Sequence, residues 1–493
     1  MFLSPQKSGI FHFIGLGGIG MSGIAEVLHQ QGYQVQGSDM SDNDNVKRLR
    51  RQGIEVFVGH NAAHLHGKDI SVVVVSSDIK ASNVELMAAR SLGLSIIKRA
   101  EMLAELMRVQ PSIAVAGTHG KTSTTSLGAS VLVVGNIDPT IINGGIMADC
   151  GSNARLGAGQ WTLVEADESD GSFLKLPATI GIVTNIDLDH MENYQDFDDL
   201  KQAFVTFIKK LPFYGLGIVC SDDPGVKAIL PLLQDRRFVT YGTEHDADIR
   251  AENIQLHSDR SSFDIVLSSK AQKLFKHNKE DKNLKNITVA MIGHHNVLNS
   301  LSIIAMALEV GISNELMRQG LENFKGVGRR FTQVGEVSGI KIIDDYAHHP
   351  EEIKAVLSMA RLACVGQVIV VMQPHRYSRI ADLYENFCTC FDNLDHLILT
   401  PIYGAGETIR PEFTHHRLAQ DIQDKGQNKD QMSVQTIEQP QELAAMISTL
   451  AKPGDMILCL GAGTISAWAK DLTQQLQDFQ SQKIPSYKKV NLS

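Results

Sequence analysis

The sequence predicts an α/β protein with three domains, and three observations lead to that fold class. Short apolar strands alternate with helical stretches along the chain, which is typical of parallel sheets covered by helices. Glycine-rich turns join a strand to a helix at residues 15–20, 117–122 and 461–463. The chain has 493 residues, and at roughly 150 residues per domain this length accommodates about three domains.

Composition and charge narrow the class of protein. Hydrophobic residues make up 43% and charged residues 20%, which describes an ordinary globular protein. The net charge of −9 favours neither a nucleic acid nor a membrane as partner. The six cysteines lack zinc or disulfide spacing, so we expect reduced thiols. Without a signal-like segment or an apolar run of ~18 residues, we expect a cytoplasmic protein, either a monomer or a homodimer.

The first region carries a dinucleotide-type glycine turn. A strand at 11–14 leads into Gly15-Leu-Gly17-Gly18-Ile-Gly20, and Asp39 follows the next strand. Such glycines let the backbone approach a diphosphate at a helix N-terminus, and the acid can hold a ribose hydroxyl. NAD satisfies this chemistry, and so does a UDP-sugar. Ser76 and Ser77 end a further parallel strand, where either ligand contact or turn chemistry would explain them.

The second region opens with a phosphate loop. The apolar strand 113–116 runs into Gly117-Thr118-His119-Gly120-Lys121-Thr122-Ser123, which opens a helix. Converging backbone N–H groups, the Lys121 ammonium and the Thr122 hydroxyl suit a nucleotide phosphate with Mg²⁺. Val115 stands where the usual pattern has its first glycine, so the loop is a shortened form.

Two strands after this loop end in polar residues. The strand 161–165 runs into Glu168, and the strand 180–185 is followed by His190. Because parallel strands end at one edge of a sheet, we expect both residues near Lys121. A carboxylate there is where a Mg²⁺ ligand belongs, so we predict Thr122 and Glu168 as metal ligands and His190 as a metal ligand or a phosphate contact.

The third region repeats the alternation of strands and helices. A strand at 340–345 ends in Asp345, and a strand at 367–372 is followed by His375, Arg376 and Arg379. This pattern predicts a second doubly wound sheet. We place the domain boundaries at 1–109, 110–325 and 326–493.

Taken together, these segments resemble the Mur ligases, the ATP-dependent amide-forming enzymes of peptidoglycan synthesis. The family-wide motifs are Gly117–Thr122, Glu165-Ala-Asp-Glu168, Asn185-Ile-Asp-Leu-Asp-His190, His295-Asn296, Arg330 and Asp345. The segments 12–25, 345–350 and 374–379 resemble the member that attaches L-alanine to UDP-N-acetylmuramate. The resemblance covers nearly the whole chain and implies N-terminal and C-terminal Rossmann-like sheets around a P-loop-type ATPase domain.

The resemblance also implies roles for individual residues. The UDP-sugar would be held by Gly15, Gly17, Gly18, Gly20, Asp39, Ser76 and Ser77. ATP would be held by residues 117–123, Asn296, Arg330 and Asp345. L-Alanine would be positioned by Tyr346, His348, His375, Arg376 and Arg379. Catalytic roles would fall to Lys121, Glu168, His190, Arg330, His348 and His375, with ATP and Mg²⁺ as cofactors.

The sequence leaves other functions open. An NAD-dependent oxidoreductase would explain the first glycine turn but not the second nucleotide site. A related ligase that attaches a recycled tripeptide to the same sugar nucleotide is closer, although the motif at 374–379 argues against it. A nucleotide-sensing module without catalysis would leave Lys121, Glu168 and His190 unexplained.

Overall fold

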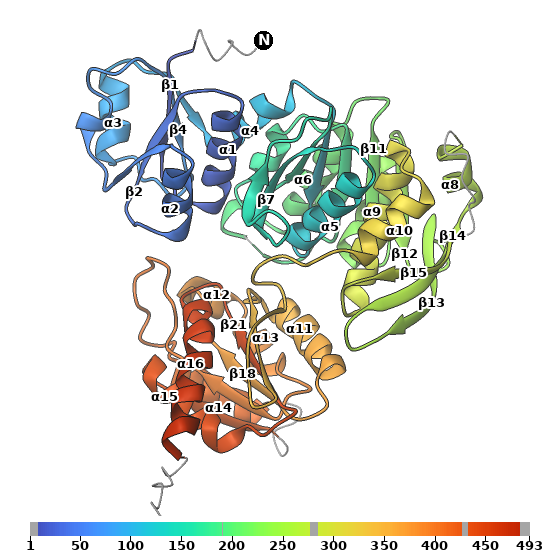
Figure 1. The fold of residues 1–493 in the computed structure, drawn as a ribbon. Helices are drawn as coiled ribbons and strands as arrows, with labels where there is room; N and C mark the ends of the chain where they lie inside the picture. The colour runs from blue at the N-terminus through green and yellow to red at the C-terminus, as the bar shows by residue number, and fades with distance from the viewer. Residues whose placement is uncertain (1–7, 190, 277–283, 426–431, 484–493) are drawn as a thin grey trace, which may run out of the picture. The chain divides into compact units, whose positions relative to one another are not determined.

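The computed structural model describes residues 8–189, 191–276, 284–425 and 432–483. These residues form three sheets with helices packed on their faces, which confirms the predicted α/β class (Figure 1). The chain divides into two compact units. The first is Met1–Gln255 with Ser261–Met291 and Asn296–Val327, and the second is Leu256–Arg260 with Ile292–His295 and Gly328–Ser493.

The N-terminal sheet of the first unit is parallel, with the strand order β3-β2-β1-β4-β5. Its strands are β1 (Ile10–Ile14), β2 (Val35–Asp39), β3 (Glu55–Val58), β4 (Ile70–Val75) and β5 (Ile96–Lys98). One face packs against α1 (Ile19–Gln30), α2 (Asp44–Arg51) and α4 (Arg99–Met107), and the other against α3 (Val84–Ser91). Because β1 pairs with both β2 and β4, the glycine turn after β1 lies where the strand order reverses, the usual ligand position in such sheets.

The central sheet has ten strands in the order β15-β14-β13-β12-β11-β10-β6-β9-β7-β8. The strands that matter for the site are β6 (Ser112–Ala116), β9 (Thr162–Glu165) and β10 (Ile180–Val183), which are parallel and adjacent. The others are β7 (Thr140–Met147), β8 (Ser152–Arg155), β11 (Leu216–Cys220), β12 (Phe238–Gly242), β13 (Ile249–Leu256), β14 (Ser261–Leu267) and β15 (Leu284–Val289). Three neighbouring strands therefore end along one edge, as the sequence predicts.

Helices cover both faces of the central sheet. One face packs against α5 (Lys121–Val134), α9 (His294–Val310) and α10 (Asn314–Glu322). The other packs against α6 (Phe197–Lys209) and α7 (Pro224–Ile229). This layering confirms the predicted central α/β sheet.

Helix α1 also packs against β7 and β8 of the central sheet, an arrangement that the sequence did not indicate. The Ser152 hydroxyl donates to Glu26 Oε2 at 2.8 Å, and Asn153 Nδ2 donates to the Ile19 carbonyl at 2.5 Å. Arg48 Nη2 donates to Asn153 Oδ1 at 2.6 Å. The helix that follows the first glycine turn thus joins the two sheets of this unit.

The second unit contains one sheet with the order β16-β17-β21-β18-β19-β20. Among the described strands, β16 (Thr332–Val337) alone is antiparallel. The parallel strands are β17 (Ile340–Asp345), β18 (Val368–Met372), β19 (His396–Leu399), β20 (Ser433–Thr436) and β21 (Met456–Leu460). One face packs against α11 (Pro350–Ala363), α13 (Tyr384–Thr389) and α14 (His415–Lys425), and the other against α15 (Pro440–Leu450) and α16 (Ile465–Lys483). The predicted second doubly wound sheet is confirmed.

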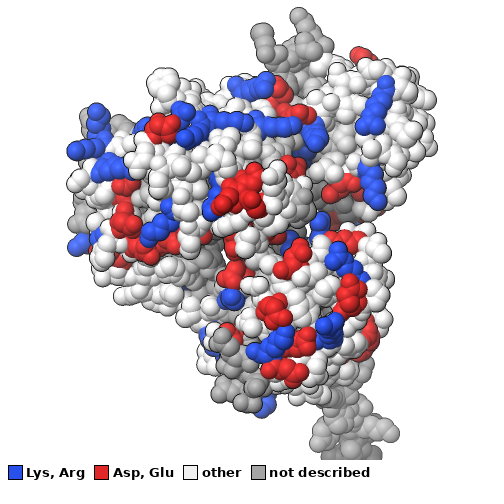
Figure 2. Space-filling model, turned by 180° about the vertical axis from the view of Figure 1, so that it is seen from behind, with Lys and Arg blue, Asp and Glu red and all other residues white. Residues whose placement is uncertain are grey.

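The surface carries both signs of charge. Basic and acidic side chains are interspersed on the face drawn in Figure 2. Within the described ranges, no helix combines the length and hydropathy needed to cross a bilayer.

Candidate active site

The phosphate loop connects β6 to α5, and two of its glycines adopt conformations that other residues avoid. Gly117 has φ +129° and Gly120 has φ +82°. A Cβ atom on Gly117 would lie 2.1 Å from Thr184 Oγ1, so that position has no room for a side chain. The turn therefore depends on glycine for both backbone angle and space.

Lys121 is the first residue of α5 and points back into the loop. Its ammonium donates to the carbonyls of Gly117 at 2.7 Å and Thr118 at 3.0 Å, and to Glu168 Oε1 at 2.9 Å. Glu168 is 1% exposed, and burial raises its pKa to about 7 although the ammonium opposes that change. Burial lowers the pKa of Lys121, but the carboxylates of Glu168, Asp167 and Glu165 outweigh it, and the net pKa is raised. The ammonium thus stays charged where a phosphate would need it.

A second carboxylate, that of Glu165 at the end of β9, lies beside the first turn of α5. Thr122 Oγ1 donates to Glu165 Oε1 at 3.1 Å, and the Gly144 amide donates to Oε2 at 2.8 Å. A Cβ on Gly144 would approach this carboxylate to 2.4 Å, so the glycine makes room for it. The hydroxyl of Thr122 and the carboxylates of Glu165 and Glu168 are the hard oxygen ligands that Mg²⁺ prefers. The chain therefore offers a donor set that fits this ion.

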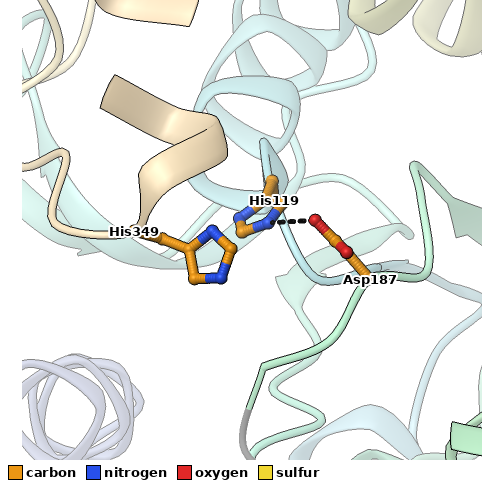
Figure 3. Close-up of side chains that lie close together, drawn as sticks. All are labelled: His119, Asp187 and His349. Carbon is orange, nitrogen blue, oxygen red and sulfur yellow. Dashed lines mark hydrogen bonds and ion pairs between the residues drawn. The ribbon is translucent and has the colours of Figure 1, made fainter. Parts of the chain in front are cut away.

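The segment after β10 holds the phosphate loop in place. The Asn185 side chain accepts from the His119 amide at 2.7 Å and donates to the His119 carbonyl at 3.0 Å. The Asp187 amide donates to Thr118 Oγ1 at 2.9 Å, and the His119 ring meets Asp187 Oδ2 at 3.3 Å (Figure 3). His190, predicted as a metal ligand, lies outside the described residues.

Asn296 approaches the same loop through its neighbour on α9. It is 4% exposed and its Oδ1 accepts from Asn299 Nδ2 at 3.1 Å. Asn299 in turn lies against Gly120, since a Cβ there would be 3.1 Å from Asn299 Oδ1. Of the other predicted ATP contacts, Ser123 is in the first turn of α5, whereas Arg330 and Asp345 belong to the second unit.

The first glycine turn contacts its predicted acid. Asp39 Oδ2 accepts from the Gly17 amide at 2.8 Å, and Asp39 Oδ1 accepts from the Ser41 amide at 3.0 Å. Gly15 has φ +85°, and a Cβ on it would lie 3.0 Å from Ser76 Cβ. Gly18 precedes α1 as its N-cap residue. The carboxyl end of β1 therefore gathers Asp39 and Ser76 around the turn; Ser77 follows Ser76 in the chain.

Arg99 links this turn to the carboxylates of the central sheet, and sequence reasoning missed it. A Cβ on Gly20 would lie 3.1 Å from Arg99 Cδ, so the side chain covers the glycine. Arg99 Nη2 is 3.6 Å from Asp167 Oδ2, next to Glu168. Glu165, Asn185 and Asp187 were also missed as site residues. Their place at strand ends beside the loop is the signal that could have found them.

Asp345 anchors the loops of the second unit at the end of β17. It is 3% exposed, accepting from the Phe331 amide at 2.6 Å and the Ala347 amide at 2.7 Å. Burial raises its pKa to about 6, against the opposing charge of Arg330. Arg329, which has φ +61°, lies over the Tyr346 ring at 4.6 Å and donates to the Gly461 carbonyl at 2.7 Å. The ends of β17 and β21 are thereby joined.

The predicted alanine-binding residues come together at this edge. The rings of Tyr346 and His348 are 5.1 Å apart, those of His348 and His375 are 5.5 Å apart, and Arg379 Nη1 lies 3.4 Å from His375 Nδ1. Arg376 has φ +64° and its amide donates to the Tyr403 carbonyl at 2.9 Å. These residues converge from the ends of β17 and β18.

The two histidines of this cluster differ as bases. Burial, together with the neighbouring His348 and arginine charges, lowers the pKa of His375 to about 3. His348 Nδ1 lies 2.9 Å from the Tyr346 carbonyl, which can only accept, so Nδ1 carries a proton, and in the neutral ring Nε2 keeps its lone pair. His349, the third residue labelled in Figure 3, instead caps α11, where its Nδ1 accepts from the Glu351 amide at 3.3 Å. His348 is therefore the better placed base of the pair.

Comparison with known proteins gives family matches along most of the chain. Residues 10–110 match the model described as Mur ligase family, catalytic domain, residues 115–307 the Mur ligase middle domain, and residues 329–463 the Mur ligase, glutamate ligase domain. The UDP-N-acetylmuramate–L-alanine ligase of Rhodospirillum rubrum is 51% identical over 479 residues, 97% of each chain. That of Azorhizobium caulinodans is 49% identical over 473 residues, 96% of this chain and 99% of the relative.

Solved structures show the same similarity. The crystal structure of the UDP-N-acetylmuramate–alanine ligase of Thermotoga maritima superposes with a TM-score of 0.79 at 26% identity, covering 96% of this chain and 100% of that one. A murein peptide ligase of Psychrobacter arcticus superposes with a TM-score of 0.69 at 23% identity, covering 95% and 99%. The second comparison supports the fold alone.

Proposed function

Because this chain belongs to the Mur ligase family, we propose that it joins L-alanine to the lactyl carboxylate of UDP-N-acetylmuramate while converting ATP to ADP and phosphate. The observation that carries the proposal is 51% identity across 97% of both chains to a ligase of that name. The product would be a precursor of peptidoglycan. We propose that the reaction takes place in the cytoplasm, where ATP is available.

The site chemistry supports an ATP-dependent ligase over the NAD-dependent alternative. A dinucleotide oxidoreductase needs one glycine turn, whereas this chain also has a phosphate loop whose Lys121 ammonium meets a buried carboxylate. We assign the UDP-sugar to residues 1–109, ATP to residues 110–325, and L-alanine to residues 326–493, which also supply Arg330 and Asp345 for ATP. The family matches at 10–110, 115–307 and 329–463 support these divisions.

The first chemical step is activation of the carboxylate. A carboxylate does not react with an amine directly because its oxygen is a poor leaving group. Its attack on the γ-phosphate of ATP forms an acyl phosphate and releases ADP. Lys121 offsets the negative charge that spreads over the transferring phosphoryl oxygens, as preorganised cations do in phosphoryl transfer. Mg²⁺ held by Thr122, Glu165 and Glu168 would neutralise further phosphate charge.

The second step is attack by the amine of alanine on the acyl carbon. Phosphate then leaves from a tetrahedral intermediate, and the amine nitrogen loses a proton. We assign His348 Nε2 as the acceptor of that proton, because its Nδ1 is tied to the Tyr346 carbonyl and the pKa of His375 is too low for a base near neutral pH. Arg376 and Arg379 would hold the alanine carboxylate.

A phosphate-release assay across a panel of amine substrates tests the proposal. With ATP, Mg²⁺ and UDP-N-acetylmuramate, we expect phosphate release that depends on L-alanine and is weaker with glycine or L-serine. Glycine lacks one methyl group, which is worth about 1–3 kcal/mol of discrimination, and an apolar pocket rejects the added hydroxyl of L-serine only weakly. Both amino acids should therefore react measurably. Release that depends on the tripeptide and not on L-alanine would establish the recycling ligase instead.

A further inference from the structure

A cluster of two histidines and one glutamate lies in the second unit, apart from the proposed alanine-binding residues. His415 and His416 are the first two residues of α14, and Glu438 follows β20, the last strand of the sheet. His415 Nε2 is 3.1 Å and His416 Nε2 is 2.7 Å from the same atom, Glu438 Oε1. The ligand atoms of all three residues lie within 4.8 Å of one another. The ligase reaction makes no use of these residues.

We propose that His415, His416 and Glu438 form a binding site for a divalent transition-metal ion of the Zn²⁺ class. Two imidazole nitrogens and a carboxylate oxygen suit Zn²⁺, Ni²⁺ or Cu²⁺ better than Mg²⁺, which prefers oxygen ligands alone. Three protein ligands leave one tetrahedral position for water. The site is independent of the proposed ligase function.

The distances are close to those that coordination requires. Zinc binds histidine nitrogen and carboxylate oxygen at about 2.0–2.1 Å, so two tetrahedral ligands lie about 3.4 Å apart. The observed separations of 3.1 Å and 2.7 Å therefore need to lengthen only slightly. The Glu438 side chain is 55% exposed and can make this adjustment, whereas the His415 side chain, 10% exposed, is held by packing.

Neighbouring groups prepare the rings for a metal. His416 Nδ1 is 3.1 Å from Thr436 Oγ1, a hydroxyl that can accept the Nδ1 proton and leave Nε2 bare for an ion. The two ring centroids are 4.1 Å apart, and both Nε2 atoms face Glu438 Oε1.

A bound ion would pin the start of α14 to the edge of the sheet. Thr436 and Glu438 belong to the end of β20 and the residues after it, and α14 packs on β20. The ion would therefore tie an exposed edge strand to its covering helix. We expect Zn²⁺ to raise the unfolding temperature of the second unit, and Mg²⁺ not to do so through this site.

Titration of the full chain with Zn²⁺ alone tests the proposal. We compare the wild type with His416→Ala and Glu438→Gln by calorimetry, and follow ¹³Cε1-labelled histidines by NMR. We expect each variant to bind one equivalent of Zn²⁺ at least about tenfold more weakly, and the wild-type signals of His415 and His416 to shift together. His66→Ala removes an exposed imidazole elsewhere, and Glu412→Gln removes an exposed carboxylate three residues before His415 that is not a proposed ligand. Both should leave that equivalent unchanged.

Both readouts can overturn the site. Identical Zn²⁺ isotherms in the wild type and the two variants would show that the ion binds elsewhere. Signals of His415 and His416 that stay in place after one equivalent would show that the cluster is a hydrogen-bonding arrangement only. Circular dichroism of each variant checks that a lost equivalent does not come from unfolding, and alanine-dependent phosphate release should remain at its wild-type rate.

Discussion

Replacing Lys121 by methionine tests two roles of its ammonium, one in phosphoryl transfer and one in keeping the Glu168 carboxylate charged. The variant removes the ammonium that donates to Glu168 at 2.9 Å but keeps a side chain of similar length. We expect it to lose product formation, because the ammonium that offsets charge on the transferred phosphoryl group is gone. UDP-N-acetylmuramate should still bind. Retention of more than a few per cent of activity would contradict the assignment of the phosphate loop.

The same variant should acquire a pH-dependent loss of stability. The pKa of Glu168 in the folded protein is about 7, above its value in the unfolded chain. A raised pKa means that stability is lost as the pH rises through the folded value. Without Lys121 the pKa of Glu168 rises further, so the loss continues above pH 7 instead of levelling off.

The size of this effect follows from the linkage relation. A carboxyl group that stays protonated in the fold lowers the free energy of unfolding by about 1.36 kcal/mol per pH unit. Between pH 7 and about pH 8.5 this amounts to about 2 kcal/mol. In the wild type, where Glu168 is already half ionised at pH 7, this group lowers the free energy of unfolding by only about 0.4 kcal/mol over the same interval. The stability gap between variant and wild type should therefore widen by about 1.5 kcal/mol.

Urea unfolding at the two pH values measures the gap. In a Trp468→Phe background the remaining Trp161, next to β9, reports on the first unit. The double variant Lys121→Met with Glu168→Gln has no carboxyl group at position 168 to titrate and should show no such widening. Lys325→Met, which removes an exposed lysine 3.2 Å from Asp149, serves as the matched control. A gap that is the same at both pH values, or that persists in the double variant, would refute the reasoning.

Three further predictions follow from other parts of the chain. Arg379→Ala should raise the KM for alanine with the KM for ATP little changed; steady-state kinetics check this, and an unchanged alanine dependence would remove Arg379 from the pocket. His348→Gln should abolish the fall in reaction rate at low pH that protonation of the base causes, whereas His375→Gln should keep it. The reverse result would make His375 the base. Glu85 is fully buried and hydrogen-bonded by His12, and although burial opposes it, such bonds lower its pKa to about 2. Its carboxylate stabilises the fold above the unfolded pKa. The urea stability gap of Glu85→Gln should therefore shrink by up to about 3 kcal/mol as the pH falls from the unfolded pKa of 4.5 to the folded pKa of about 2.

Much of the fold could be predicted because local patterns encode it. Buried strands such as β6 and β21 are short continuous apolar runs, and the glycines after them mark turns whose backbone angles only glycine adopts readily. Strands β7 and β8 were not predicted. Their sequences contain Gly144, Gly145 and Asn153, residues that are poor strand formers, and they are stabilised by partners distant in the sequence, including α1.

The candidate site was predicted where it rests on one local motif and incompletely where it rests on tertiary contacts. Lys121 and Thr122 are recognisable from the loop itself. The role of Glu165 depends on its pairing with Thr122, and that of Arg99 on its approach to Gly20, which no spacing in the sequence reveals. His190, His348 and Arg379 remain predictions from the family resemblance, and the experiments above test His348 and Arg379.

The shortened phosphate loop is held in its conformation by the segment that follows β10. In this chain Val115 is a fully buried residue of β6, so the turn begins only at Gly117. The segment after β10 then fixes the loop from outside, through Asn185 on the backbone of His119 and Asp187 on Thr118. With the loop held in this way, the carbonyls of residues 117 and 118 can orient the Lys121 ammonium towards Glu168. A change at Asn185 should therefore impair phosphoryl transfer even though the residue need not touch ATP.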